Sequence, residues 1–343
     1  MAGAMLFVSP FSRLSGAAAA VFLVFTAVAT ADGCGSGGSP ARNTTDAGVD
    51  LSGNDNGPGP AEAGTEAGAE AAAGADPSFD HVVLLMHFDG DDASTTFTDV
   101  KGHTVAANGA AHLDATTKAM GSGSGAFDGT SGYLTLMNSN DWNFGAGDFT
   151  IELSVYFTGS IANQRKLPTF FGMWGPSAVN QSWELCYNVN YTGAGANDQM
   201  AGNLYVVFST TGTDEVIPAS AWVPTGDTWY RLAAVRHGAD FLYFVDGTLI
   251  GTATLGSAAV PDWNRTDPAS NSGDWIPDGG VGPTAAIHAN DTARLSIGVG
   301  VGAPGIVNDD TYFKGFIDEV RITKGVARYT AAYTPPSAPF PDR

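Results

Sequence analysis

One acidic side chain occupies the apolar face of a predicted strand near the end of the chain. From Phe316 the sequence alternates with period two, which places Phe316, Asp318, Val320 and Ile322 on one face and Ile317, Glu319, Arg321 and Thr323 on the other. This pattern predicts a half-buried strand. A carboxylate in apolar surroundings is costly unless it is hydrogen-bonded, paired or bound to a metal. Asp318 therefore needs a partner, which is either a set of backbone amides or a structural calcium ion.

The sequence contains no recognisable constellation of catalytic residues. Glycoside hydrolases use two carboxyl groups across the scissile bond, but Glu152 in IELSVY and Glu184 in WELCYN have no acidic partner at close spacing. The signatures of serine hydrolases, P-loop proteins, zinc proteases and paired-cysteine sites are absent from the sequence as well. We therefore expect no catalytic residues and a protein that is not an enzyme.

The long segment between Leu255 and Ala293 gathers aromatic and polar side chains. We select four of them as candidate ligand-binding residues: Trp263, Asn264, Asp274 and Trp275. Indole faces stack on the CH groups of a sugar, while Asn and Asp groups bond its hydroxyls. The alternative is that both tryptophans only pack this segment against the rest of the domain. A shorter segment offers a second candidate group, made of Trp174, Trp183 and Tyr191.

A scaffold of short strands must position these side chains. Strands are predicted at 81–88, 149–157, 241–245, 249–254 and 293–298. Asp246-Gly247 between two apolar runs predicts a type I′ hairpin. In the strand at 149–157, Glu152 falls on a polar face that we expect to be solvated.

Five sequence blocks resemble, in order, strands of the laminin-G-like jelly-roll domains of the concanavalin A-like lectin/glucanase superfamily. The blocks are LLMHFDG (84–90), GSGAFDGTSGYLTL (123–136), GAGDFTIELSVYF (145–157), WYRLAAVR with LYFVDGTLIG (229–251) and GFIDEVRITKGVARY (315–329). The resemblance implies an all-β fold, a jelly-roll β-sandwich of two antiparallel sheets. The superfamily includes lectins, adhesins, hydrolases and inert spacers, so the fold does not assign a function. Its hydrolases carry a Glu-x-Asp-x-x-Glu cluster on one strand, which this sequence lacks.

The resemblance also implies a metal site. In jelly rolls of this family the first and last strands lie side by side, which would bring Asp89 close to Asp318. Two like charges at short range cannot both stay ionised without a cation, and calcium binds carboxylate and carbonyl oxygens. We therefore expect a structural calcium at Asp89 and Asp318. The alternative is that the aspartates at 89–92 cap a turn.

The sequence before the domain predicts export. Residues 1–33 have the features of a signal peptide, with an apolar run at 17–29 and a small-residue cleavage site. Cys34 lies in a sequence similar to a bacterial lipoprotein box and would then be lipidated; the alternative is cleavage after Ala31. Residues 34–78 are predicted to be a disordered Gly/Ala/acidic linker before the domain at 79–343. Cys186 is predicted to be buried and unpaired.

The charge of the chain narrows the class of partner. A formal net charge of −20 argues against nucleic acid and against adsorption to anionic membranes, so membrane contact is expected only through a lipid anchor. We expect a non-catalytic carbohydrate-binding or adhesion module with a polysaccharide or glycan ligand, lipid-anchored at the bacterial outer membrane or cell surface, or secreted. The alternatives are a structural or protein-interaction β-sandwich and, behind it, a glycoside hydrolase. The sequence leaves ligand identity and oligomeric state open.

Overall fold

The computed structural model describes residues 74–174, 180–190, 200–257, 260, 262–264, 276–277, 280–300 and 309–343. All of them belong to one compact unit, Glu62–Arg343. They form two antiparallel sheets, which confirms the predicted all-β sandwich, together with the short 3-10 turns η1 (Phe79–His81), η2 (Asn140–Trp142), η3 (Ile161–Asn163) and η5 (Asp309–Thr311). No helix in this part of the chain is long and apolar enough to cross a membrane. The predicted signal peptide, Cys34 and the linker up to residue 73 lie outside the described residues.

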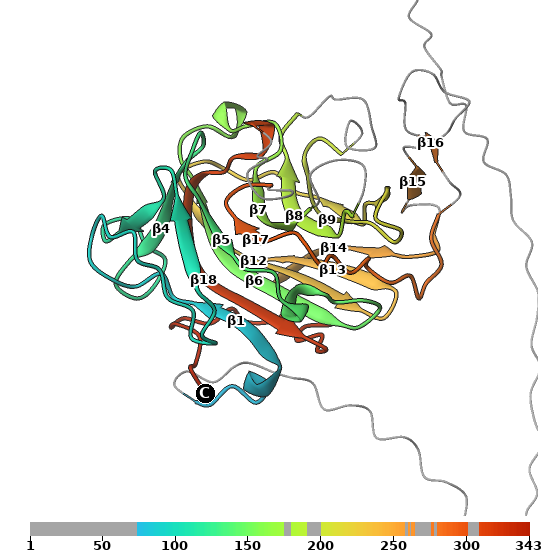
Figure 1. Cartoon of the computed structure of the whole chain (residues 1–343), viewed down its shortest axis with the longest axis horizontal. Helices are drawn as coiled ribbons and strands as arrows, with labels where there is room; N and C mark the ends of the chain where they lie inside the picture. Colours follow the sequence, from blue (N-terminus) through green and yellow to red (C-terminus); the bar gives the residue numbers. More distant parts are fainter. Residues whose placement is uncertain are drawn as a thin grey trace, which may run out of the picture. The chain divides into compact units, whose positions relative to one another are not determined.

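The first sheet has eight strands in the order β14-β13-β12-β6-β18-β4-β3, with β1 also paired to β18. The strands are β1 (Val82–Met86), β3 (His112–Asp114), β4 (Ser124–Asp128), β6 (Phe149–Phe157), β12 (Trp229–His237), β13 (Asp240–Val245), β14 (Thr248–Thr254) and β18 (Lys314–Lys324). The first strand β1 lies beside the last strand β18, with Met86 opposite Val320 (Figure 1). This confirms the expected pairing of the ends of the domain.

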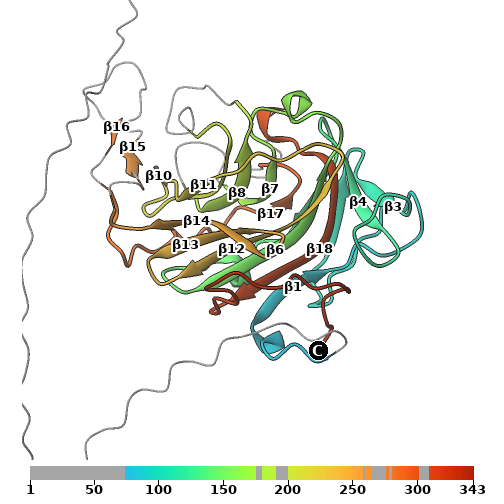
Figure 2. The ribbon, with the colours of Figure 1, turned by 180° about the vertical axis from the view of Figure 1, so that it is seen from behind.

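The second sheet has ten strands in the order β16-β15-β10-β9-β8-β7-β17-β5-β2, with β11 also paired to β9. The strands are β2 (Val105–Asn108), β5 (Tyr133–Leu136), β7 (Thr169–Met173), β8 (Trp183–Asn188), β9 (Asn203–Phe208), β10 (Asp214–Val216), β11 (Ala219–Ala221), β15 (Asp262–Asn264), β16 (Ile276–Pro277) and β17 (Leu295–Ile297). Figure 2 shows this sheet behind the strands β14, β13, β12 and β6 of the first sheet.

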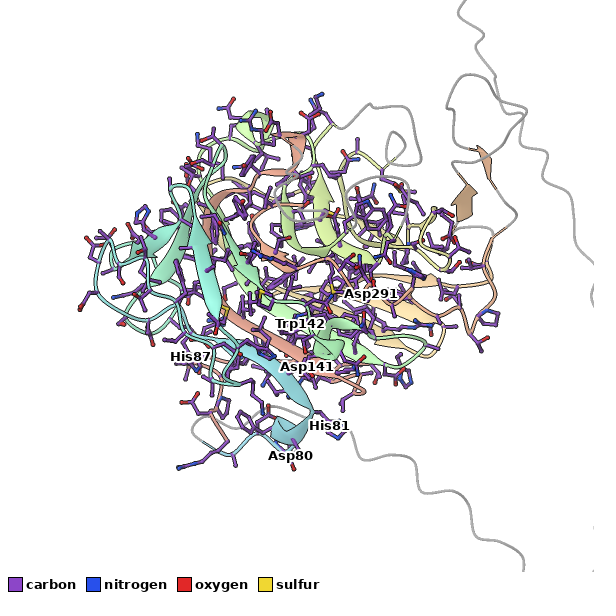
Figure 3. All side chains as sticks on the ribbon, in the orientation of Figure 1. Asp80, His81, His87, Asp141, Trp142 and Asp291 are labelled. Atoms are coloured by element: carbon purple, nitrogen blue, oxygen red, sulfur yellow. The ribbon has the colours of Figure 1, made fainter. Side chains whose placement is uncertain are left out.

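Apolar side chains from both sheets fill the space between them. The alternating apolar residues of β6 are all buried, and they meet Trp183 and Leu185 of β8 across the core. Trp142 of η2 is fully buried (Figure 3), and its carbonyl oxygen accepts a hydrogen bond of 2.9 Å from the indole N–H of Trp183. Each large apolar side chain buried in this way contributes roughly 1.5–3 kcal/mol to folding.

The hairpin between β13 and β14 forms as the sequence predicts. Asp246 and Gly247 have φ of 49° and 74°, the pair of positive values that a type I′ turn requires. Gly247 also approaches another backbone closely, since a Cβ on it would lie 2.0 Å from the carbonyl oxygen of Tyr333. Only glycine satisfies both conditions at this position.

Two expectations about exposure are wrong. Strand β18 is buried on both faces rather than on one, and Glu152 of β6 is only 3% exposed. The period-two pattern of β18 breaks between Asp318 and Arg321, where Glu319 has a φ of 47°, so Ile317 and Val320 both reach the core. Residues before β1 and after β18 pack on the outer face of this sheet, an arrangement that a local pattern does not reveal.

A buried ionic network holds these covering residues. Arg321 donates to both carboxylate oxygens of Glu152 at 2.8 and 3.0 Å and to Asp76 at 3.0 Å. Arg328 donates to Asp76 at 2.6 and 3.0 Å, and the hydroxyl of Tyr329 donates to Glu152 at 2.8 Å. Asp76 lies in the stretch predicted as linker, and here it packs against the domain. Mutual pairing compensates the desolvation of these charges.

Candidate functional site

The structure places the backbone of two of the four predicted ligand-binding residues near one edge of the ten-stranded sheet. Trp263 and Asn264 belong to β15, which pairs with β10, so that Trp263 stands opposite Glu215 and Asn264 opposite Asp214 in the backbone register. Asp274 and Trp275 lie outside the described residues. The described strands of this segment, β15 and β16, therefore extend the sheet at β10.

The face of strands β8, β9 and β10 that points away from the core carries two acidic side chains. Along β8, Trp183 and Leu185 face inward and Glu184 outward; along β10, Val216 faces inward and Glu215 outward. We call this surface the acidic face and define it by its outward residues Glu184, Cys186, Tyr205, Val207 and Glu215. All five are buried, and the two glutamates are each 6% exposed. A sheet surface that holds two carboxyl groups with so little water is unusual.

Glu184 sits between two glycines. A Cβ on Gly172 would lie 2.8 Å from the Cγ and Oε1 atoms of Glu184, and one on Gly300 would lie 2.6 Å from Oε1. Any larger residue at either position would collide with the carboxyl group or its stem. The side chain of Glu184 therefore occupies space that is free only because residues 172 and 300 are glycines.

The environment of Glu184 favours its neutral form. Burial, followed by the negative charge of Glu215, raises the pKa of Glu184 to about 8. Within the described part of the chain, no hydrogen bond to the carboxyl group opposes this shift. At neutral pH Glu184 is therefore mostly a carboxylic acid, which can donate a hydrogen bond as well as accept one.

A neighbouring acid shows what a structural carboxylate looks like in this sheet. Asp214, next to Glu215, accepts hydrogen bonds from the backbone N–H groups of Thr210 and Thr211, both at 2.8 Å, and from the hydroxyls of Ser209 and both threonines. Although burial raises the pKa of Asp214, these hydrogen bonds lower it below its ordinary value. The hydrogen bonds of Asp214 stabilise a turn, whereas no described residue donates a hydrogen bond of this kind to Glu184.

Cys186 and the second tryptophan group complete this region. Cys186 is a buried free cysteine, as predicted, and burial together with the nearby Glu184 raises the pKa of its thiol. Trp174 packs against the small apolar cluster around Cys186. Trp183, grouped with Trp174 from the sequence, instead belongs to the core and is fully buried. It is therefore not available to a ligand.

Asp89 and Asp318 both bind the loop at 119–123. Asp318 Oδ2 accepts from the N–H groups of Ala119 and Met120 at 2.8 and 3.0 Å, and Asp89 Oδ1 accepts from the N–H and, at 2.9 Å, the hydroxyl of Ser122. Burial raises the pKa of Asp318 to about 7, while these amide hydrogen bonds lower it.

These contacts bear on the calcium expectation. Amide hydrogens point at carboxylate oxygens that a cation would need, and the described residues contain no group of three or more His, Cys, Asp or Glu side chains that could hold a metal. The geometry fits a hydrogen-bonded loop anchor better than a cation site. A structural calcium at Asp89 and Asp318 stays a prediction.

In the sequence, Glu184 stands as an acid without a partner at close spacing, and Glu215 is not recognisable as its neighbour. The two acids are separated by strand β9 in the sheet and by 31 positions in the chain (215 − 184), so no local spacing links them. The local signal that existed was the alternation of WELCYN, in which the acid and the cysteine share the face opposite to tryptophan and leucine.

Comparisons with known proteins locate only distant structural similarity. No family model matches this chain, and no curated protein matches it. The binding domain of Paraclostridial Mosquitocidal Protein 1 is similar over 73% of this chain at 10% identity with a TM-score of 0.48, and the match spans 50% of that chain. Domain 4 of AbnA, a GH43 extracellular arabinanase from Geobacillus stearothermophilus solved with arabinotriose, is similar over 72% of this chain and 93% of its own at 16% identity and a TM-score of 0.44. The binding domain of Botulinum neurotoxin DC, solved with rat synaptotagmin II, is similar over 73% of this chain and 50% of its own at 11% identity and a TM-score of 0.45.

Proposed function

We propose that this chain is a non-catalytic carbohydrate-binding module and that the acidic face takes part in binding. The observation that supports this most directly is the state of Glu184, a buried carboxyl group that faces away from the core without a hydrogen bond from the described residues. A carboxyl group in this state can donate a hydrogen bond to a hydroxyl group of a ligand and accept one from it. Perturbed acids of this kind concentrate at functional sites.

The chemistry of the acidic face suits a sugar. A protonated Glu184 donates a hydrogen bond to a hydroxyl oxygen, and a carboxylate at Glu215 accepts one from a hydroxyl hydrogen. Strand β15 contains Trp263 and Asn264 and pairs with β10, so that Trp263 stands opposite Glu215 in the backbone register. Acids, amide and indole together supply the polar and stacking contacts of a carbohydrate site.

The test is binding of the purified chain to a broad glycan array, repeated for Glu184→Gln and Trp263→Ala. Glutamine keeps the shape of the side chain but cannot ionise, so we expect a changed pH dependence of binding above pH 7. Asp80→Asn is the matched control, because Asp80 is an exposed acid on η1 with no role in this face (Figure 3). Specific binding that both site variants weaken and the control retains would support the proposal. An array without any hit would favour the structural or protein-interaction alternative.

We further propose that the module is displayed at a bacterial cell surface through lipidation of Cys34. The proposal rests on the similarity of the segment around Cys34 to a lipoprotein box and on the acidic linker that follows it. A fatty-acid probe should label the wild-type protein in cells, and Cys34→Ala should abolish the label. Equal labelling of the two proteins would remove the lipid anchor and leave a secreted module.

Glycoside hydrolysis is the second candidate, and one observation favours it. An acid with a raised pKa beside a second carboxyl group is the arrangement that general acid catalysis of glycoside cleavage uses. A reducing-end assay on every polysaccharide that binds separates the two functions. Turnover that Glu184→Gln removes, while binding persists, would establish hydrolysis; binding without turnover would leave the non-catalytic module.

A further inference from the structure

A row of three aromatic side chains crosses the outer face of the eight-stranded sheet. Trp229 at the start of β12, Tyr156 near the end of β6 and Phe316 of β18 are direct neighbours in the register of these three strands. Their ring centroids lie 5.5 Å (Trp229 to Tyr156) and 5.7 Å (Tyr156 to Phe316) apart. Each of the three is only partly buried, in contrast to Glu152 and Arg321 further along the same face. We call these three residues the aromatic row.

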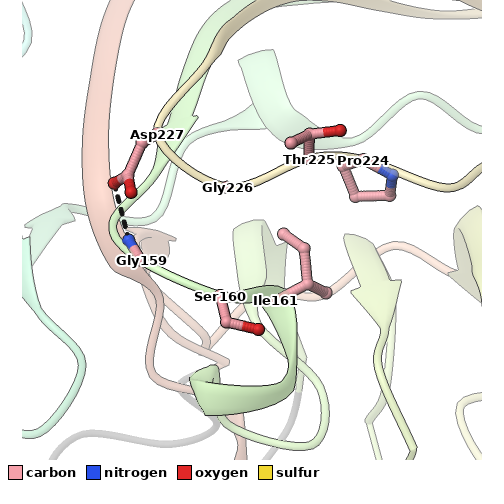
Figure 4. A pocket seen from close by; sticks show the side chains of 7 residues that line it. All are labelled: Gly159, Ser160, Ile161, Pro224, Thr225, Gly226 and Asp227. Carbon is pink, nitrogen blue, oxygen red and sulfur yellow. Dashed lines mark hydrogen bonds between the residues drawn. The ribbon is translucent and has the colours of Figure 1, made fainter.

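A hollow of about 420 Å³ lies at the end of this row. It is formed between the loop that follows β6 and the loop that precedes β12 (Figure 4). Ser160 and Ile161 line one side, and Pro224 and Thr225 the other. Val223, beside this second loop, is 88% exposed and adds apolar surface next to the hollow.

The two loops are fixed to each other at the base of the hollow. Asp227 accepts a hydrogen bond of 2.7 Å from the N–H of Gly159 and donates its own N–H to the carbonyl oxygen of Phe157 at 2.8 Å. A Cβ on Gly226 would lie 1.7 Å from the carbonyl oxygen of Gly159, so the two backbones touch. The hollow is therefore preformed, and a ligand would not have to order it.

Tyr156 connects the aromatic row to the hollow. Burial, the charge of Asp227 and a hydrogen bond to that carboxylate raise the pKa of Tyr156. Tyr156 also directly precedes Phe157, whose carbonyl oxygen accepts from the N–H of Asp227 at 2.8 Å, so the tyrosine of the row and the acid of the hollow belong to one surface. It consists of ring faces and edges on one side and of hydroxyl, carboxylate and backbone groups on the other.

The charges around the hollow restrict what it can bind. Its lining holds one acid, Asp227, and no basic residue, and the whole chain carries a formal net charge of −20. An anionic ligand such as a uronic-acid polymer would be repelled. An uncharged, hydroxyl-rich chain would find aromatic surface for its CH groups and acceptors for its hydroxyls.

We propose that the aromatic row and the adjoining hollow form a second binding surface, specific for an uncharged glycan chain. The inference rests on the proposed carbohydrate-binding function, but it uses a different sheet from the acidic face. Two surfaces on opposite sheets would let one module contact two chains, or two stretches of one polymer, and so raise its apparent affinity.

Two variants of the full chain test this surface in different ways. Trp229→Ala removes one end of the row. Ser160→Trp fills the hollow from an exposed position and removes none of the contacts described above. Asp80→Asn, at an exposed acid on η1 away from both surfaces, is the matched control, and thermal melting confirms that each variant is folded. The probes are uncharged oligosaccharides of glucose, mannose, xylose and arabinose, with oligogalacturonate as the anionic comparison, measured by calorimetry.

We expect both variants to weaken binding of at least one uncharged oligosaccharide by roughly tenfold, as loss of one stacking contact implies, while Asp80→Asn leaves that affinity unchanged. Uncharged oligosaccharides that bind both variants as tightly as wild type would overturn the second surface and leave the proposed function intact. Binding of oligogalacturonate that depends on Trp229 would overturn the specificity for uncharged chains. If the wild-type protein binds no oligosaccharide and no glycan on the array, the proposed function and this inference both fail.

Discussion

Replacing Glu184 by glutamine should stabilise the protein, increasingly so as the pH rises. The pKa of Glu184 is about 8 in the folded protein against 4.5 for an unperturbed glutamate, because the side chain is buried and Glu215 lies nearby. Between these two values the folded protein holds a proton that the unfolded chain has lost. Its stability therefore falls as the pH rises through this window. Glutamine has no proton to lose and should escape the loss.

The size of the effect follows from the two pKa values. At pH 7 the unfolded chain gains about 3 kcal/mol from ionising this glutamate, and the full shift corresponds to about 5 kcal/mol above pH 8. At pH 5 the gain is only about 1 kcal/mol. The neutral acid and the amide have nearly the same size and shape, so the difference between the two proteins should grow from small at pH 5 to several kcal/mol at pH 8.5.

Urea unfolding of wild type and Glu184→Gln at pH 5, 7 and 8.5, without any sugar, measures this difference directly. Other titrating groups are common to both proteins and cancel in the comparison. Glu215→Gln serves as a second probe, since removal of its charge should lower the pKa of Glu184 and shorten the window on its alkaline side. A difference that stays constant from pH 5 to 8.5 would refute the argument, because it would mean that Glu184 ionises normally.

Three further predictions concern the ends of the domain. Arg321→Met should cost about 3–5 kcal/mol in urea unfolding, because Glu152 would stay buried without its bidentate partner; a loss below about 1 kcal/mol would show that the network contributes little. The pKa of His87 is raised from 6.5 to about 9. Burial lowers this pKa, but hydrogen bonds to Glu319 and Asp342 and the charges of these two carboxylates outweigh burial. The stability from this pair is full below pH 6.5 and is lost as the pH rises through 9, so His87→Gln should flatten the alkaline limb of the stability profile, and NMR titration of the ring checks the pKa. Finally, the melting temperature should be the same with calcium and with chelator if the two loop-binding aspartates act through amides alone, whereas a drop in chelator would establish the calcium site.

Local patterns were sufficient wherever the structure is local. The type I′ turn at Asp246-Gly247 depends on two adjacent residues, and both have the positive φ that their types allow. The burial of Cys186 follows from its place in an apolar, strand-like run. The order of the blocks that resemble laminin-G-like strands also anticipated the pairing of the first strand with the last.

Prediction failed where residues far apart in the chain decide the environment. Glu152 alternates with apolar residues and looks solvated, but Arg321 and Asp76, distant in sequence, bury it. The strand that contains Asp318 looks half-buried, but a break at Glu319 and a covering segment change both of its faces. Period-two alternation reports which face of a strand is apolar; it does not report what packs against the polar one.

Two buried acids, Asp318 and Glu184, differ in what their carboxyl groups contact. Asp318 and Glu184 both have strongly raised pKa values, about 7 and about 8, and burial is the leading cause in each. The carboxylate of Asp318 nevertheless accepts hydrogen bonds from three backbone N–H groups. These bonds fix a loop, so the buried acid stabilises the fold. Glu184 gains no such contact from the described residues, and its side chain fills the space that Gly172 and Gly300 leave by having no Cβ. A residue that weakens the fold and is accommodated all the same is best explained by what it binds, and this is why the acidic face, rather than the better satisfied acids of the first sheet, is where we expect a ligand.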